Sequence, residues 1–262
     1  MLEVSHVTKK YGKNTACDDV TFTLDSGSLT VLLGPNGAGK STIMKSIIGF
    51  LKYSGSIAVN GIPNKTSEAR KVLGYIPEMP SLYSTLTVSE HMEFIARAYK
   101  LTNYKERIDM LLTRFELADK KKKFGDELSK GMQQKLNLCL GLLPDPDIIL
   151  LDEPLLGLDP HAIKELKIMI EEMRKEGKTM LISTHIIDSV DMMWDRTVIM
   201  QGGRVKANVT RPEIDGMGKT LEDLFFEVTE GIDRESVSEQ AQAEDVPTDE
   251  NGNTNTAEGG EA

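Results

Sequence analysis

Short apolar runs typical of β-strands occur along most of the chain. In the first sixty positions they are VTFTL at 20–24, LTVLL at 29–33 and GSIAVN at 55–60. In the second half they are IILL at 148–151, TMLIS at 179–183 and RTVIM at 196–200, with helical patterns near 160–175 and 186–194 between them. Strands that alternate with helices are typical of a parallel sheet covered by helices, so we predict an α/β protein.

The stretch from 87 to 143 has a different pattern, in which apolar residues recur at helical spacing. It predicts three helices, one over 87–100, one over 105–117 and one that begins near Ser129. The sequence therefore predicts a helical insertion within the α/β core.

The negative charge of the chain is concentrated at its C-terminal end. The formal net charge is -10, and residues 230–262 hold ten acids and one base. This segment is also poor in large apolar residues, so we expect a disordered acidic tail that either solubilises the protein or makes a regulatory contact. The rest of the chain is nearly neutral, and its charge neither demands nor excludes an anionic partner.

The sequence also bears on where the protein resides. Its apolar stretches fall far short of the roughly 18 residues that a membrane-spanning helix needs. The first ten residues, MLEVSHVTKK, lack the basic start and apolar core of a secretion signal. We therefore expect a cytoplasmic protein that does not insert into the membrane.

The most informative motif is GPNGAGKST, which fits the phosphate-loop pattern G-x-x-x-x-G-K-[ST] and lies between a predicted strand and a helical run. Its residues are Gly34, Pro35, Asn36, Gly37, Ala38, Gly39, Lys40, Ser41 and Thr42. The glycines let backbone N–H groups converge on phosphate oxygens, and Lys40 adds a positive charge for the β and γ phosphates. The Ser41 hydroxyl is a candidate ligand of Mg²⁺. The motif predicts nucleotide binding but leaves kinases, GTPases and ATPases open.

Two adjacent carboxylates follow the apolar strand at 148–151. Asp152 lies at the C-terminal end of this strand, where ligands of open α/β sheets bind, and is expected to reach Mg²⁺ through water. Glu153 points elsewhere and could orient or deprotonate an attacking water. Two acids at a strand end could instead be surface charge, but the four preceding residues of buried type argue against it. The pair favours nucleotide hydrolysis.

Three further motifs are LSKGMQQ at 128–134, GLDP at 157–160 and STH at 183–185. Together with the phosphate loop and the two carboxylates, in this order, they resemble the motifs of the ABC ATPase family over about residues 1–229. The resemblance implies an ATPase core with a mixed sheet flanked by helices, an N-terminal antiparallel β subdomain and a helical subdomain at about 87–143. It also implies that Tyr11 stacks on the adenine of ATP.

The resemblance further implies that the protein works in pairs. Ser129 and the Gly131 backbone would form a second anion site at a helix start, too far from the phosphate loop of their own chain. Each ATP would then lie between Lys40 of one protomer and Ser129 of the other, in a homodimer or in a heterodimer with a related ATPase. His185 would contact the γ-phosphate, and Asp159 would cross the dimer seam.

The sequence departs from the family at three motif positions. Glu78 stands where the family usually has glutamine, and its carboxylate can bind Mg²⁺ but cannot donate a hydrogen bond when ionised. In LSKGMQQ, which resembles the LSGGQ signature motif of the family, Lys130 and Met132 replace a glycine and a glutamine, whereas Ser129 and Gly131 are retained. Because these two residues are retained, we expect activity to survive the changes at Lys130 and Met132.

Transmembrane permease subunits are the partners that the resemblance implies. They would dock in a groove between Glu78 and Thr87 and hold the protein at the inner face of the cell membrane. The patterns YIPE, LSKGM and LEDLFFEV look most like ATPases of bacterial export systems for drugs, peptides or lipids, with importers left open.

Two other functions are alternatives. A soluble ABC ATPase of translation or DNA maintenance usually has two cassettes or long coiled coils, and neither occurs in this sequence, so we expect no nucleic-acid partner. A P-loop kinase for a small metabolite is disfavoured by Glu153 beside Asp152 and by the LSKGMQQ motif. The sequence thus favours an ATP-hydrolysing transport subunit.

Overall fold

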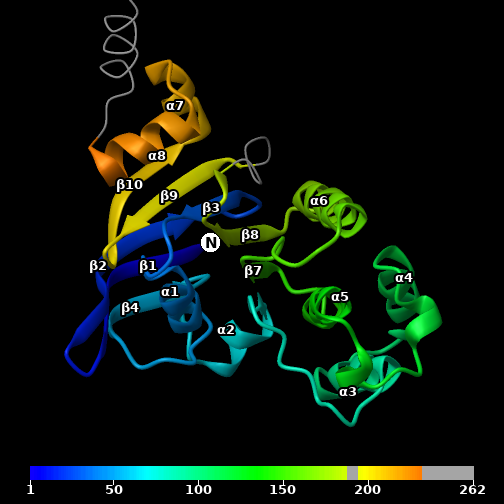
Figure 1. Cartoon of the computed structure of the whole chain (residues 1–262). Coiled ribbons are helices and arrows are strands. Elements are labelled where there is room, and N and C mark those ends of the chain that lie inside the picture. The colour runs from blue at the N-terminus through cyan, green and yellow to red at the C-terminus, as the bar shows by residue number, and fades with distance from the viewer. Residues whose placement is uncertain (188–193, 232–262) are drawn as a thin grey trace, which may run out of the picture.

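The computed structural model describes residues 1–187 and 194–231, whose strands form two sheets (Figure 1). The four-stranded sheet has the order β2-β1-β4-β5, and the six-stranded sheet has the order β10-β9-β3-β8-β7-β6. The strands are β1 (Leu2–Tyr11), β2 (Asn14–Leu24), β3 (Leu29–Leu33), β4 (Ser54–Val59), β5 (Ile62–Pro63), β6 (Leu73–Ile76), β7 (Ile148–Asp152), β8 (Thr179–Thr184), β9 (Arg196–Gln201) and β10 (Arg204–Thr210). The helices are α1 (Lys40–Ile47), α2 (Ser67–Lys71), α3 (Val88–Ala98), α4 (Lys105–Arg114), α5 (Lys130–Leu142), α6 (Pro160–Lys175), α7 (Arg211–Met217) and α8 (Leu221–Glu230), with 3-10 turns at Ala118–Lys120 and Gly125–Glu127.

The six-stranded sheet is parallel except at one edge. β9, β3, β8, β7 and β6 pair in parallel, whereas β10 pairs antiparallel with β9. The two-residue turn between β9 and β10 consists of Gly202 and Gly203, both with positive φ (57° and 79°). Such a turn can only join antiparallel strands. The sheet is therefore mixed, and the predicted α/β fold class is confirmed.

Two hydrophobic cores lie on the two faces of this sheet. The first contains Val4 of the four-stranded sheet, Ile43 of α1 and Leu32 of β3. The second contains Val31 and Leu33 of β3 together with side chains from α3, α4, α5 and α6. A strand that is buried on both faces sends alternate side chains to opposite sides, which explains the unbroken apolar run of β3.

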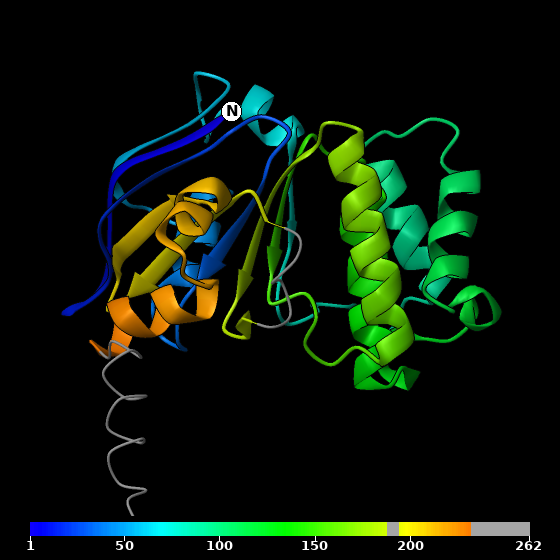
Figure 2. The ribbon, with the colours of Figure 1, turned by 90° about the horizontal axis from the view of Figure 1, so that it is seen from above.

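The helices are distributed unevenly around the sheet. α3, α4, α5 and α6 gather beside β7 and β8, whereas α7 and α8 lie next to β9 and β10 (Figures 1 and 2). Thr87 caps the start of α3, and the helix ends at Ala98, two residues before Lys100, which has a left-handed φ of 55°. Gly141 of α5 lies close to β6, because a Cβ added there would be 2.3 Å from Cγ1 of Ile76.

Several sequence predictions can be compared with these elements. The three helices predicted within 87–143 correspond to α3, α4 and α5, and the third begins immediately after Ser129. The helix predicted near 186–194 lies largely outside the described residues, as does the acidic tail beyond Gly231. Within the described ranges, the structure contains no helix with the length and apolarity needed to cross a membrane.

Candidate functional site

The loop between β3 and α1 is held against two other strands. A Cβ added to Gly34 would lie 2.3 Å from the carbonyl oxygen of Met200, and one added to Gly39 would lie 2.5 Å from that of Ala16. Gly39 also has a left-handed φ of 104°, and Gly37 has a φ of 82°. Glycine is therefore required for the close backbone approach that packs this loop between β2 and β9.

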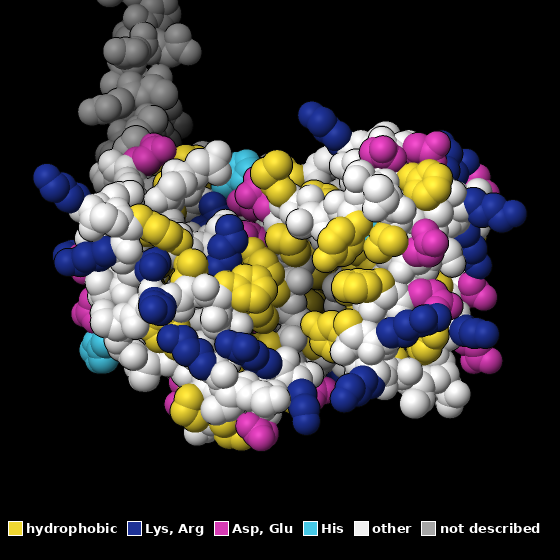
Figure 3. Space-filling model, turned by 90° about the horizontal axis from the view of Figure 1, so that it is seen from below, with side chains coloured by type: hydrophobic (Ala, Val, Ile, Leu, Met, Phe, Trp, Pro, Cys, Tyr) yellow, Lys and Arg dark blue, Asp and Glu magenta, His cyan; other side chains and the backbone are white. Residues whose placement is uncertain are grey.

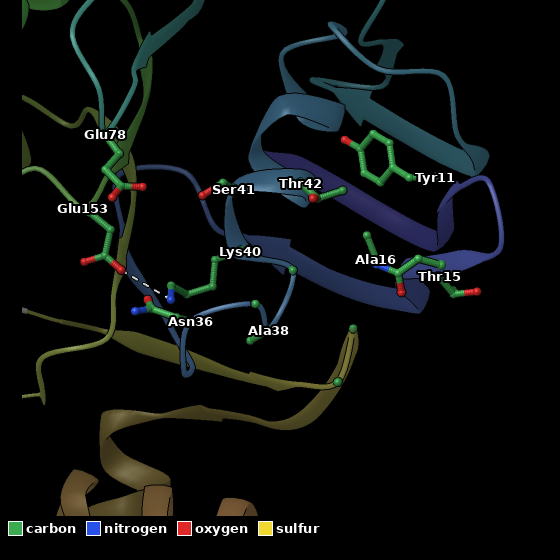
Figure 4. Close-up of a pocket in the computed structure, with 15 residues that line it drawn as sticks. Tyr11, Thr15, Ala16, Asn36, Ala38, Lys40, Ser41, Thr42, Glu78 and Glu153 are labelled. Atoms are coloured by element: carbon green, nitrogen blue, oxygen red, sulfur yellow. Dashed lines mark ion pairs between the residues drawn. The ribbon is translucent and has the colours of Figure 1, made fainter.

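Lys40, the first residue of α1, places its ammonium inside this loop. The side chain is 6% exposed, and Nζ donates hydrogen bonds to the carbonyl oxygens of Gly34 (2.7 Å) and Pro35 (3.4 Å). Nζ also lies 3.3 Å from Oε1 of Glu153, which is equally buried (Figure 4). A buried charge needs an opposite charge nearby, so this ion pair joins the loop to the end of β7.

Asp152 is fixed by three hydroxyl groups from three different elements. Its Oδ1 accepts hydrogen bonds from Ser183 Oγ of β8 (2.6 Å) and Ser41 Oγ of α1 (3.1 Å). Its Oδ2 accepts one from the Tyr75 hydroxyl of β6 (3.1 Å). Burial, and next the charge of Asp152, raise the pKa of Tyr75 well above its usual range, which keeps this hydroxyl a donor. Asp152 and Ser41, the two residues of this group that the sequence analysis names as candidate Mg²⁺ ligands, are therefore in contact.

Glu153 turns away from β7 because its backbone is left-handed, with a φ of 48°. Such a conformation costs a residue with a side chain about 1–3 kcal/mol, and two hydrogen bonds from its N–H to Ser183, at the carbonyl oxygen (3.1 Å) and at Oγ (3.0 Å), stabilise it. The turn directs the carboxylate to a position between Lys40 and His185, whose Nδ1 is 2.9 Å from Glu153 Oε1. The two predicted catalytic side chains are thus in direct contact.

A cavity of ≈ 600 Å³ opens in front of the loop. Its lining residues are Tyr11, Asn14, Thr15, Ala16, Asn36, Gly37, Ala38, Gly39, Lys40, Ser41, Thr42, Glu78, Glu153, Gly202 and Gly203. The volume is within the range of small-molecule and cofactor sites. Tyr11 lies at the end of the cavity remote from Glu78 and Glu153 (Figure 4), with the Lys9 ammonium 4.7 Å from its ring centroid. A nucleotide with its base near Tyr11 and its phosphates near Lys40 fits this layout.

Some lining residues were missed by the sequence analysis. Gly202 and Gly203 belong to the β9–β10 turn, and the Gly203 N–H donates to the Ala38 carbonyl oxygen (3.1 Å). Paired glycines indicate a tight turn, but no local signal places that turn beside the phosphate loop. Thr15 and Ala16 of β2 were missed because no local signal in the sequence places this part of β2 beside the phosphate loop.

The signature residues Ser129 and Gly131 lie outside the cavity at the phosphate loop. Ser129 and Gly131 are absent from the residues that line the cavity, and Ser129 caps α5 by accepting a hydrogen bond from the Met132 N–H (3.3 Å). Lys130 and Ser129 are exposed. The structure therefore separates this helix start from the phosphate loop of its own chain.

Asp159 is held within its own chain. Its carboxylate accepts a hydrogen bond from the Ala162 N–H at the start of α6 (2.9 Å) and pairs with Lys135 Nζ of α5 (2.7 Å). Lys135 is 8% exposed and also pairs with Glu116 (3.0 Å). The hydrogen bond from Lys135 is the main reason why the pKa of Asp159 is lowered. Lys135 was not identified from the sequence, where it is one more polar residue of a helix.

Glu78 follows β6 and lines the cavity with an exposed side chain. The preceding residue, Pro77, accepts a hydrogen bond from Asn137 Nδ2 of α5 (2.8 Å), which ties this segment to the helical insertion. Ser41, Asp152 and Glu78 supply oxygen atoms, the donors that Mg²⁺ prefers, so the residues present fit this ion. Across residues 1–187 and 194–231, no three His, Cys, Asp or Glu side chains are arranged to hold a metal ion, so this is a partial donor set.

Several known proteins are similar to this chain in sequence and fold. The model of the ABC transporter family matches residues 17–156. The ABC-type transporter ATP-binding protein EcsA of Bacillus subtilis is 38% identical over 238 residues, which cover 87% of this chain and 96% of that protein. The lantibiotic transport ATP-binding protein SrtF of Streptococcus pyogenes is 36% identical over 226 residues, which cover 86% and 96%. A solved structure of an ATP binding subunit of an ABC transporter is 38% identical, with a TM-score of 0.82 over 87% of this chain and 99% of that one.

The ion pair between Lys135 and Asp159 can be tested by its pH dependence. Because folding lowers the pKa of Asp159, the ionised carboxylate stabilises the folded protein fully at pH values above its pKa of about 3.9 in the unfolded chain. This stabilisation is lost as the pH falls through the lower pKa of the folded protein. In a double-mutant cycle of Lys135→Met and Asp159→Asn, we expect a coupling free energy of about 0.5–1 kcal/mol at pH 7. Urea unfolding from pH 7 down to about pH 3 should show this coupling decline below the unfolded pKa. A coupling that stays constant over this range would contradict the assignment.

Proposed function

The chain belongs to the ABC transporter family of ATP-binding subunits and is a transport ATPase, and from this premise we propose that each ATP is enclosed between two subunits. The observation that supports this is the separation of two anion sites. Lys40 lines the cavity, whereas Ser129 at the start of α5 does not. An ATP held by the phosphate loop would therefore meet a signature serine only from a second subunit, either an identical copy or a related ATPase.

Within one subunit, the phosphate loop would hold the triphosphate and Tyr11 would stack on adenine. Residues 36–42 of the loop line the cavity where the phosphates would bind, and the Lys40 ammonium would move from Glu153 toward the more highly charged phosphates. This exchange of partners would free the Glu153 carboxylate. Nucleotide binding would thereby prepare the side chain that hydrolysis needs.

Glu153 is the proposed general base. Once it is released from Lys40, its carboxylate can accept a proton from water as that water attacks the γ-phosphorus. His185 lies against the same carboxylate and would orient it or contact the γ-phosphate. Asp159 would reach the dimer seam from the start of α6, where its side chain is about half exposed (47%).

Ser41, Asp152 and Glu78 are the residues proposed to hold Mg²⁺. The ion supplies positive charge that neutralises the β and γ phosphate oxygens. Ser41 already contacts Asp152, which supports a shared role for them. Glu78 adds a carboxylate where the family usually has an amide, so it can ligate the ion but, when ionised, cannot donate a hydrogen bond to the attacking water.

A transmembrane subunit would dock on the face shown in Figure 3. Hydrophobic side chains gather there on both sides of a hollow between two lobes. Met79 (78% exposed) and Tyr83 (56% exposed) belong to the segment between Glu78 and Thr87, where the sequence predicted this contact. Apolar side chains that gather in one exposed patch mark interaction sites. Such docking would place the protein on the cytoplasmic face of a membrane without insertion.

We assign export as the direction of transport. The patterns YIPE and LSKGM resemble export ATPases. The relative SrtF is named for lantibiotic transport. The transported substrate would be selected by the transmembrane subunits, because the cavity at the phosphate loop is lined by the nucleotide motifs.

Glu153→Gln should separate binding from hydrolysis. The amide keeps the size of the side chain but cannot accept a proton, so we expect ATP turnover to fall at least about 100-fold with ATP affinity retained. The variant should then accumulate as an ATP-bound dimer on size-exclusion chromatography. Elution as monomer alone at saturating Mg-ATP would contradict the two-subunit mechanism.

Complementation between two inactive variants tests the shared site directly. Lys40→Ala and Ser129→Ala should each lower ATPase activity at least about 100-fold, because every site of a homodimer then lacks one half. In a mixed dimer one site regains both Lys40 and Ser129, so an equal mixture should recover about a quarter of wild-type activity. Lys45→Ala removes an exposed lysine of the same helix α1 and should leave activity near the wild-type value. A mixture no more active than its components would contradict a shared site.

A further inference from the structure

Tyr75 connects an exposed surface to the carboxylate of Asp152. It lies in β6 opposite Leu150 of β7, and its half-buried side chain packs against the first hydrophobic core. From there its hydroxyl reaches Asp152 Oδ2 at 3.1 Å. The Tyr75 side chain thus extends from β6, the edge strand of the sheet, to the C-terminal end of β7, where the candidate metal ligand Asp152 lies.

The three hydroxyl donors to Asp152 differ in what else they contact. Ser41 lines the cavity and is itself a candidate Mg²⁺ ligand, so its hydroxyl would bind the ion instead of holding Asp152. Ser183 is fully buried and donates to Oδ1. Tyr75 holds the other oxygen, Oδ2. Orientation of the whole carboxylate therefore depends on Ser183 and Tyr75 together.

The ring of Tyr75 is supported from the protein surface. Phe50, which follows the C-terminal end of α1, meets it edge to face, with ring centroids 6.1 Å apart and an angle of 85° between the planes. Phe50 is 71% exposed. Edge-to-face contacts of this kind favour one ring orientation. The position of the Tyr75 hydroxyl is thus coupled to a side chain that a partner can touch.

We propose that Tyr75 is a positioning residue for the divalent cation. The Tyr75 hydroxyl orients Asp152, and Phe50 holds the Tyr75 ring from the protein surface. The proposal rests on the proposed function, because it takes Asp152 as a metal-binding side chain. Hydrogen bonds to metal-ligating carboxylates set metal affinity, and their loss typically weakens it by about 10–100-fold. A subunit that docks on Phe50 would thereby act on metal binding.

Tyr75→Phe removes the hydroxyl and keeps the ring. We would measure the binding of a fluorescent ATP analogue to the full chain, first in EDTA and then as Mg²⁺ is added. The Mg²⁺ concentration for half-maximal effect should rise about tenfold, while affinity for the analogue in EDTA stays unchanged. Retained metal-free affinity shows that the fold and the phosphate loop are intact, since Tyr75 does not line the cavity.

Tyr53→Phe is the matched control. Tyr53 is also half buried, packs against the same core, and donates its hydroxyl to Asn64 Oδ1 (2.5 Å) rather than to Asp152. This variant should leave the Mg²⁺ midpoint at the wild-type value. A rise of equal size in both variants would make the effect structural and overturn the proposal.

Phe50→Leu tests the support from the surface, with Phe94→Leu, another exposed aromatic residue, as its control. Phe50→Leu should raise the Mg²⁺ midpoint by less than Tyr75→Phe, and Phe94→Leu should leave it unchanged. If wild-type binding depends on Mg²⁺ and Tyr75→Phe leaves the Mg²⁺ midpoint unchanged, the inference about Tyr75 is overturned, whereas the proposed function is not. A wild-type protein that binds no analogue would overturn the proposed function itself.

Discussion

The buried ion pair between Lys40 and Glu153 is the contact on which the rest of the site depends. Both side chains are only 6% exposed, and a single charge in such a place would be strongly destabilising. The pair therefore fixes the end of β7 relative to the phosphate loop. Two local conditions permit it: Gly34 and Gly39 let the loop approach β9 and β2, and the left-handed backbone of Glu153 turns its carboxylate out of the strand. A competing polyanion has to displace one partner of this pair.

Much of the site could be predicted because its chemistry is contiguous in the sequence. The phosphate loop and the Asp152–Glu153 pair each follow an apolar strand, and a strand end in a parallel sheet is a defined location. Tyr75 and Lys135 could not be found in this way. Their partners are 77 and 24 residues distant in the sequence, at Asp152 and Asp159, and nothing nearby in the sequence distinguishes them from other polar residues. The alternation of strands and helices was sufficient to predict the fold class. It did not predict that β10 runs antiparallel to β9, because this direction depends on the glycine turn that joins the two strands.

α5 is the element that brings the separate parts into relation. Ser129 caps its start, Lys135 in its middle pairs with Asp159, and Asn137 donates a hydrogen bond to Pro77 beside Glu78. These contacts reach the segments before α6 and after β6. α5 therefore connects the nucleotide-binding segments with the helical insertion.

The close approach of Gly141 to Ile76 makes α5 and β6 inseparable as building blocks. A helical insertion taken from a related ATPase, with a larger residue at this position, would be displaced from β6, because an added Cβ would overlap the isoleucine. Such chimaeras would need to carry both segments from the same parent. For engineering, the helical insertion and the edge strand therefore form a single exchangeable module.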